Sequence, residues 1–190
     1  MRNTIKSTNS LAGYFLVSTL QMPDSRFAGQ VVYVCSHNSN GALGLVINKP
    51  DCNLSFAQVL REMGMEVSRA ELPSVYIGGP VSLDAAFVLY RSHPYEGNHI
   101  DITDNISLSR EKELLELVVG ENSSRNYLFL VGYVGWESGQ LELELRDNSW
   151  LVVPGDEQVI FDLPDGEKWK AAAAYYGIDI TTFNENLGYA

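Results

Sequence analysis

Residues 31–50, with the sequence VVYVCSHNSNGALGLVINKP, constrain the fold more than any other part of the chain. The first run, VVYV, and the return run, LVI, contain the β-branched and aromatic side chains that pack well on a pleated strand. Between the runs stand Asn38, Asn40 and Gly41, residue types that tolerate positive φ or bond their own backbone. The segment predicts a β-hairpin, with Pro50 expected to stop the return strand and begin a loop.

The remaining chain alternates strands and helices without a regular βαβ rhythm. We expect strands at residues 14–20, 74–77, 85–90, 98–102, 127–134, 150–153 and 158–161. We expect helices at residues 55–63, at residues 109–120 with Ser109 as N-cap, and after Asp165 as the cap of a final helix that ends at Gly177. The run YLFLVGYV at residues 127–134 is apolar throughout and fits a central strand buried on both faces.

Residues 141–145 are ambiguous, because Leu141, Leu143 and Leu145 alternate with charged residues at a strand period. Leucine and glutamate are also strong helix formers, and Ser138 stands where an N-cap would. We therefore assign a helix here. The pattern as a whole predicts an α+β protein with a mixed sheet and about four helices.

A length of 190 residues with 45% hydrophobic residues fits one folded domain, which we place at residues 12–182. Residues 1–11 are expected to be flexible, and residues 183–190 to form a C-terminal tail. The apolar stretch LAGYFLVSTL is too short and too polar for a membrane span or a signal peptide, so we expect a cytoplasmic protein. Cys35 and Cys52 are too few for a disulfide framework and are expected to be reduced thiols.

The charge of the chain argues against nucleic-acid binding. Thirteen basic and 24 acidic residues give a formal net charge of -11, and no Lys/Arg cluster interrupts this balance. A field of this sign repels phosphate backbones, which proteins normally bind through a basic stripe. We therefore expect a small molecule or a protein as the partner, and neither nucleic acid nor a membrane.

No familiar catalytic motif or cofactor motif is present. The segment GWESG at residues 135–139 misses the serine-elbow spacing by one position, and neither a P-loop nor a G-x-G-x-x-G fingerprint occurs. Cys35 and His37 are expected to share one face of a strand, but nothing supplies the further ligands of a zinc site. We expect no metal and no cofactor, and His37 is read as a loop histidine bonded to neighbouring carbonyls rather than as a general base.

Two segments allow either a structural or a binding interpretation. Gly78-Gly79-Pro80 is a tight turn between strands, or a close backbone approach that lines a groove. Trp136 anchors the core from a strand end, or forms with Glu137 a binding surface for a polar molecule.

Several blocks together resemble the AlgH/YqgE family of small bacterial proteins. They are residues 31–50, YIGGPV at residues 76–81, VGYVGWESGQLELEL at residues 131–145 and NSW at residues 148–150, and the agreement extends over about residues 12–182. The resemblance implies an α+β fold with a bifurcated or barrel-like sheet surrounded by helices, and it supports the helix at residues 141–145. The family name implies a link to transcriptional control of exopolysaccharide synthesis, while its biochemical activity is not established.

The chain departs from the family pattern in two places. The family usually carries a carboxylate after the cysteine, where this chain has Ser36, so a catalytic carboxylate is not expected there. The family's early M-P…D-P-x-F block survives only as Met22, Pro23, Asp24 and Phe27.

Two functional hypotheses follow. The first is a non-enzymatic binding or regulatory protein with a groove for a small molecule or another protein, and its candidate residues are His37, Asn38, Asn40, Gly78, Gly79, Pro80, Trp136, Glu137 and Gln140. The alternative is a hydrolase or transferase acting on a small polar substrate, with His37 as base and Glu137 as acid or orienting group.

Overall fold

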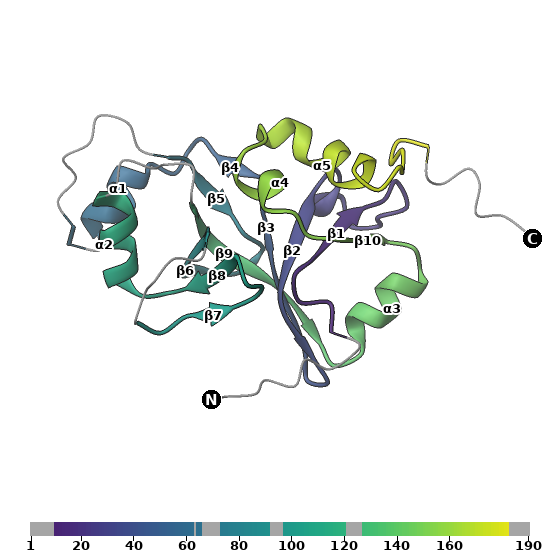
Figure 1. Cartoon of the computed structure of the whole chain (residues 1–190), viewed down its shortest axis with the longest axis horizontal. Coiled ribbons are helices and arrows are strands. Elements are labelled where there is room, and N and C mark those ends of the chain that lie inside the picture. Colours follow the sequence, from purple (N-terminus) through teal and green to yellow (C-terminus); the bar gives the residue numbers. More distant parts are fainter. Residues whose placement is uncertain (1–9, 63, 66–72, 92–96, 121–126, 183–190) are drawn as a thin grey trace, which may run out of the picture.

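The computed structural model describes residues 10–62, 64–65, 73–91, 97–120 and 127–182. Within this part of the chain the strands form one curled sheet, in the order β10, β1, β2, β3, β9, β6, β8, β7, with β4 and β5 attached beside that row (Figure 1). The strands are β1 (Tyr14–Ser18), β2 (Val31–Asn38), β3 (Gly41–Val46), β4 (Pro50–Asp51), β5 (Val75–Ile77), β6 (Val81–Arg91), β7 (Ile100–Asp101), β8 (Ile106–Ser109), β9 (Tyr127–Glu137) and β10 (Trp150–Pro154). The expected tail at 183–190 and residues 1–9 of the expected flexible segment lie outside the described residues.

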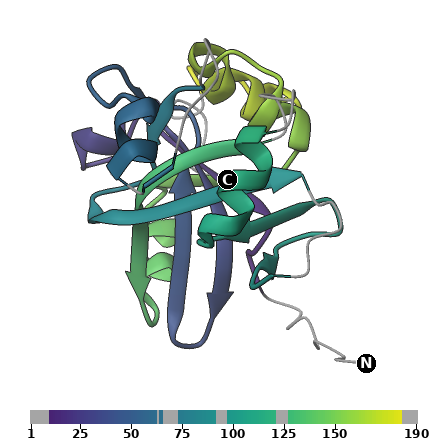
Figure 2. The same ribbon diagram turned by 90° about the vertical axis from the view of Figure 1, so that its left-hand side faces the viewer.

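The predicted hairpin is confirmed as β2 and β3. Asn38 pairs with Gly41, and the Oδ1 atom of Asn38 accepts the N–H of Asn40 at 2.8 Å, which closes the turn. The hairpin extends past the rest of the sheet together with the end of β9 (Figure 2). Pro50 does not begin a loop as expected, because it opens the two-residue strand β4, a first position at which proline's missing N–H is tolerated.

Strand β9 is the branch point of the sheet. β6 pairs with one edge of β9, while β5 and then β3 pair with successive parts of the other edge. Gly78 sits in the fork, since its N–H donates to Val131 and its carbonyl oxygen accepts from Val46, both at 2.8 Å. The expected bifurcated, barrel-like sheet of an α+β protein is confirmed.

Successive side chains along a strand point to opposite faces of the sheet and belong to different hydrophobic cores. In β2, Val31 and Tyr33 point into the concave interior beside α4 and α5, whereas Val32 and Val34 point to the opposite face beside α3. Both faces of the strand are therefore buried. β9 behaves in the same way, as its apolar sequence predicted, with Leu130 in the interior cluster and Phe129 in a third cluster under α1 and α2.

Five α-helices surround the described sheet, one more than expected: α1 (Phe56–Glu62), α2 (Lys112–Gly120), α3 (Gln140–Arg146), α4 (Glu157–Phe161) and α5 (Asp165–Ala174), with a short 3-10 helix, η1 (Ser25–Phe27). Figure 1 shows α1 and α2 together at one end of the sheet and α4 and α5 over the other. No helix in the described ranges has the length and apolar character needed to cross a membrane.

Four local predictions about these helices were wrong. Ser109 does not cap α2, because it is the last residue of β8 and α2 begins at Lys112. Residues 158–161 form part of α4 rather than a strand, because Asp156 caps this segment by accepting the N–H groups of Gln158 and Val159. Asp165 is the first residue of α5 rather than its cap, and its carboxylate bonds other side chains. Ser138 does not cap α3, whose N-cap is Gly139 in the left-handed region.

Two other predictions about the helices are confirmed, one for α3 and one for the C-terminal end of α5. α3 confirms the helix assigned at residues 141–145. After α5, the Gly177 N–H donates to Ala174 and the Ile178 N–H to Ala173, and Gly177 has a φ of 73°, which is the Schellman arrangement expected of a terminal glycine.

Candidate functional site

A groove of about 240 Å³ lies between the segment around η1 and helix α3, and we call it the tryptophan groove. Its floor is the far end of β9, where Val134, Gly135 and Trp136 follow the branch point. Its full lining is Met22, Pro23, Asp24, Arg26, Phe27, Pro80, Val81, Val134, Gly135, Trp136, Gln140, Glu144 and Ser149. The groove thus joins three stretches that are distant in sequence, namely residues 22–27, 80–81 and 134–149.

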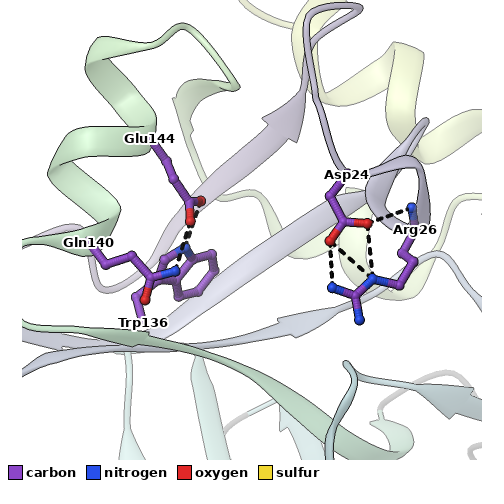
Figure 3. Close-up of polar contacts among 5 residues, drawn as sticks. All are labelled: Asp24, Arg26, Trp136, Gln140 and Glu144. Carbon is purple, nitrogen blue, oxygen red and sulfur yellow. Dashed lines mark hydrogen bonds and ion pairs between the residues drawn. The ribbon is translucent and has the colours of Figure 1, made fainter.

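One carboxylate organises the α3 wall of this groove (Figure 3). The Oε2 atom of Glu144 accepts the indole N–H of Trp136 at 2.9 Å and that of Trp150 at 2.8 Å. Its Oε1 atom accepts the side-chain amide of Gln140 at 3.0 Å, one helical turn earlier. Both indoles are 5% exposed, so the carboxylate satisfies two buried donors and fixes the orientation of both rings.

The opposite wall carries an ion pair between Asp24 and Arg26. Asp24 is the N-cap of η1, and its carboxylate accepts from both the backbone N–H and the guanidinium of Arg26, at 2.6 Å for the shortest contact. The hydrogen bond from the guanidinium lowers the pKa of Asp24. The Arg26 side chain remains 66% exposed, so its charge is presented to solvent beside the groove.

His37 lies in strand β2, outside the groove, and its ring nitrogens contact an N–H group and a carboxylate, so the prediction of a loop histidine bonded to carbonyls was wrong. Its Nδ1 atom accepts the backbone N–H of Leu11 at 3.0 Å, so in the neutral ring Nε2 carries the proton and donates to Glu142 at 2.9 Å. The pKa of Glu142 is lowered, first by a hydrogen bond from its own backbone and then by the bond from His37. The histidine therefore ties the segment before β1 to α3.

Cys35 and His37 do not share a face of β2 as predicted. The strand pairing shifts register between Val34 and Ser36, which makes Cys35 the extra residue of a β-bulge. Cys35 consequently points into the interior core, while His37 reaches α3 on the other side. Across the described ranges, no group of three or more His, Cys, Asp or Glu side chains could hold a metal ion.

The glycines of the Gly78-Gly79-Pro80 segment are buried at the fork of the sheet. A Cβ atom on Gly79 would lie 2.1 Å from the carbonyl carbon of Tyr133, and one on Gly78 would lie 2.5 Å from the carbonyl oxygen of Gly132. The close backbone approach is therefore real, but it is an approach to β9 of the same chain. Pro80 follows on the surface and lines the groove.

The predicted binding residues are thus divided among several places. Pro80, Trp136 and Gln140 line the tryptophan groove, and the N–H of Glu137 donates to the Oε1 atom of Gln140 next to it. Asn38 and Asn40 form the exposed turn of the hairpin, while Gly78 and Gly79 support the fork. A single groove that includes His37 does not form.

Several groove residues were not predicted from the sequence as site residues. Asp24 and Phe27 were noted only as remnants of a family block, and Glu144 only as a helix former. The spacing of Gln140 and Glu144 by four residues was a usable signal, because such pairs meet on one helix face. The approach of Trp150 to Glu144 depends on the return of the chain from α3 into β10, which no local pattern shows.

These features define a small α+β protein with a curled, branched sheet and a surface groove whose polar side chains bond one another. The chain belongs to the AlgH-like family, whose model matches residues 15–181. It is 38% identical to a UPF0301 protein of Methylococcus capsulatus over 181 residues, covering 94% of this chain and 96% of the relative. A UPF0301 protein of Pectobacterium carotovorum is 37% identical over 187 residues, with 95% and 100% covered.

Two solved structures share the fold. The solution structure of the AlgH protein from Pseudomonas aeruginosa superimposes with a TM-score of 0.79 at 35% identity, covering all of both chains. The crystal structure of a Corynebacterium diphtheriae protein gives a TM-score of 0.74 over 90% of each chain, and at 18% identity this likeness concerns the fold alone. No biochemical function is established for the family.

Proposed function

We propose that this protein is a non-enzymatic binding protein with a regulatory role, and that the tryptophan groove holds a segment of a partner protein. The observation that carries the proposal is the preorganised wall made by Glu144, which holds Trp136, Trp150 and Gln140 in place before any partner arrives. The two buried indoles make this wall rigid, and the exposed Gln140 that lines the groove is held in place by the same carboxylate, so little entropy would be lost when a partner binds.

The size of the groove favours a side chain of a partner over a free small molecule. Its volume of about 240 Å³ is below the roughly 300–1,000 Å³ that is usual for small-molecule sites. Its rim includes Val81, which is 37% exposed, next to Pro80 and the charged Arg26. An apolar floor with a charged rim is the pattern of a protein interface.

The contacts of the candidate catalytic residues give less support to an enzyme. His37 would have to act as a base, but its acceptor nitrogen already receives the Leu11 N–H. Glu137 lies outside the groove lining and does not contact His37, whose other nitrogen bonds Glu142.

A regulatory role through protein contacts agrees with the family resemblance and with the charge. The formal net charge of -11 disfavours direct contact with DNA. Any influence on transcription would then pass through a protein partner rather than through an operator sequence.

Site-specific photo-cross-linking tests the proposal. The full chain is produced in bacterial cells with p-benzoylphenylalanine in place of Val81 at the groove rim, and adducts are identified by mass spectrometry. The matched control carries the same group at Tyr175, which is 64% exposed on the residue following α5. We expect one protein that cross-links at position 81 and not at position 175.

The purified adduct partner is then titrated with the wild-type chain and with Val81→Asp. We expect saturable binding to wild type and a loss of at least about tenfold with the variant, equivalent to about 1.4 kcal/mol. Identical adducts from both positions, or equal affinity of Val81→Asp for the partner, would overturn the proposal.

A further inference from the structure

A second and larger cavity, of about 420 Å³, opens on the concave side of the curled sheet, away from the tryptophan groove. Six strands that neighbour one another in the sheet contribute to its lining: β2, β3, β9, β6, β8 and β7. We call it the concave cavity. Its volume lies within the roughly 300–1,000 Å³ that is usual for sites that hold small molecules.

The walls of the concave cavity are mainly apolar. Phe87, Leu108 and Cys35 belong to the interior hydrophobic core, and Leu43 and Tyr133 pack against that core while remaining partly exposed. Ile100 stands at the edge of the cavity and is 53% exposed. An open apolar surface next to the core is costly to leave in water, about 25 cal/mol per Å², so it favours an apolar occupant.

The cavity also carries one cation placed against this apolar wall. The guanidinium carbon of Arg110 lies 5.2 Å from the centroid of the Phe87 ring, which is itself part of the lining. Arg110 is exposed, and its described contact is with the Phe87 ring, whereas the neighbouring Glu111 carboxylate, which also lines the cavity, accepts the side-chain amide of Asn98. Arg110 therefore presents an exposed positive charge beside the apolar wall, in a chain whose other charges are mostly acidic.

The other polar side chains of the lining bond groups of the protein or are neutral. The Ser109 hydroxyl donates to the Asn98 carbonyl at 2.7 Å and accepts the Glu111 N–H at 3.1 Å. His99 contacts the Gly97 carbonyl and Asp101. Ser36, on the bulged part of β2, adds a neutral hydroxyl. The anionic head of a ligand would thus meet Arg110, while its body would lie against Leu43, Phe87 and Leu108.

We propose that the concave cavity binds a small amphipathic anion, with an apolar chain against the core and an acidic head group on Arg110. This site differs from the groove in position and in ligand class, so it stands independently of the proposed function. A carboxylate or phosphate head would form a charge-assisted contact with the guanidinium.

A series of ligands with the same chain and different heads tests this proposal. Purified full-length protein is titrated with decanoate, decan-1-ol and decyltrimethylammonium, and binding is followed by calorimetry and by methyl NMR signals. We expect decanoate to bind most tightly and the ammonium compound least. The shifted methyl signals should be those of Leu43, Ile100 and Leu108.

Three variants separate the contributions of head and chain. Arg110→Gln, at an exposed position, should weaken decanoate about tenfold and leave decan-1-ol unchanged. Leu43→Trp should fill the cavity and weaken both. Arg61→Gln, which removes a cation from α1, is the matched control and should change neither. Amide spectra of each variant establish that it is folded.

Several outcomes would overturn the proposal. They are the absence of saturable binding of decanoate, equal affinities for the three head groups, decanoate binding that is unaffected by Arg110→Gln, or shifts confined to residues outside the concave cavity.

Discussion

The carboxylate of Glu144 accepts the indole N–H of Trp136 at 2.9 Å, and this contact joins α3 to the end of β9. The same oxygen also accepts the indole N–H of Trp150, so loss of the carboxylate would leave two buried donors without their partner.

The first prediction concerns this carboxylate. Glu144→Ala should lower the free energy of unfolding by about 2–4 kcal/mol, since each unsatisfied buried donor costs about 1–3 kcal/mol. Glu144→Gln retains an acceptor oxygen and should lose about half as much. Urea unfolding followed by tryptophan fluorescence measures both. Glu137→Gln, at an exposed neighbouring position, is the control and should stay within about 0.5 kcal/mol. An equal loss of stability in all three variants would show that the Glu144 carboxylate does not hold the two indole N–H groups.

The second prediction concerns His37. Replacing His37 with Ala removes the acceptor of the Leu11 N–H, so the Leu11 amide should lose hydrogen-exchange protection. Glu142→Gln keeps an oxygen opposite Nε2, and protection of Leu11 should be largely retained. Amide exchange measured by NMR distinguishes the two variants. Unchanged protection of Leu11 in His37→Ala would show that this bond does not hold the segment.

The third prediction compares two glycines. Gly79→Ala would place its Cβ 2.1 Å from backbone atoms of Tyr133, which cannot move without breaking the fork, so we expect a loss of more than about 4 kcal/mol or failure to fold. Gly166, in the first turn of α5, has nothing within 4 Å of its added Cβ. Gly166→Ala should stabilise by about 0.5–1 kcal/mol. Thermal and urea unfolding test both, and a mild effect at Gly79 would exclude the tight contact.

The fourth prediction concerns Lys168, whose side chain is 2% exposed and whose Nζ atom donates to the Ile47 carbonyl at 3.0 Å and contacts Asp165 at 2.8 Å. Lys168→Met should lower the free energy of unfolding by about 1–3 kcal/mol near pH 7. The substitution removes the hydrogen-bond donor of the Ile47 carbonyl and the cation beside Asp165.

The contribution of Lys168 to the free energy of unfolding should depend on pH. Burial lowers the pKa of Lys168 from its ordinary value of 10.5. Between the lowered value and the ordinary one, the unfolded chain binds more protons than the folded chain, so the contribution of this group to stability rises with pH. The stability difference between wild type and Lys168→Met should therefore grow from about pH 7 to about pH 10. A constant or shrinking difference would contradict a lowered pKa.

The fifth prediction separates the two cysteines, which are both free. Burial raises the pKa of the Cys35 thiol, so at mildly alkaline pH it remains protonated and poorly nucleophilic. Cys52 is exposed. Brief iodoacetamide treatment of the native protein, followed by peptide mass spectrometry, should show modification at Cys52 and not at Cys35. Modification of both at similar rates would show that the interior is open to solvent.

The sequence predicted those parts of the fold that depend on neighbouring residues. The hairpin and β9 were visible because long runs of β-branched and aromatic residues bounded by turn residues leave few alternatives. α4 was mistaken for a strand because its apolar run is short, and the capping role of Asp156 outweighed the strand propensity of Val159 and Ile160. The bulge at Cys35 was also invisible, since an added residue in a strand changes no composition.

The candidate site was predictable only in part. Trp136 and Gln140 are close in the sequence and both line the groove, while their role in binding stays a prediction. The concave cavity combines side chains of six strands, and its Arg110 follows β8, a strand that we did not predict. Such a cavity becomes visible only when the curvature of the sheet is known.

Strand β1 is flanked by β2 on one edge and by β10 on the other. During synthesis, β1 leaves the ribosome before β10, which emerges only after β9 and α3. Until Trp150–Pro154 has emerged, one edge of β1 therefore lacks the strand that pairs with it, and such an edge readily pairs with other chains. This edge of the sheet is therefore completed only after most of the described strands have been synthesised.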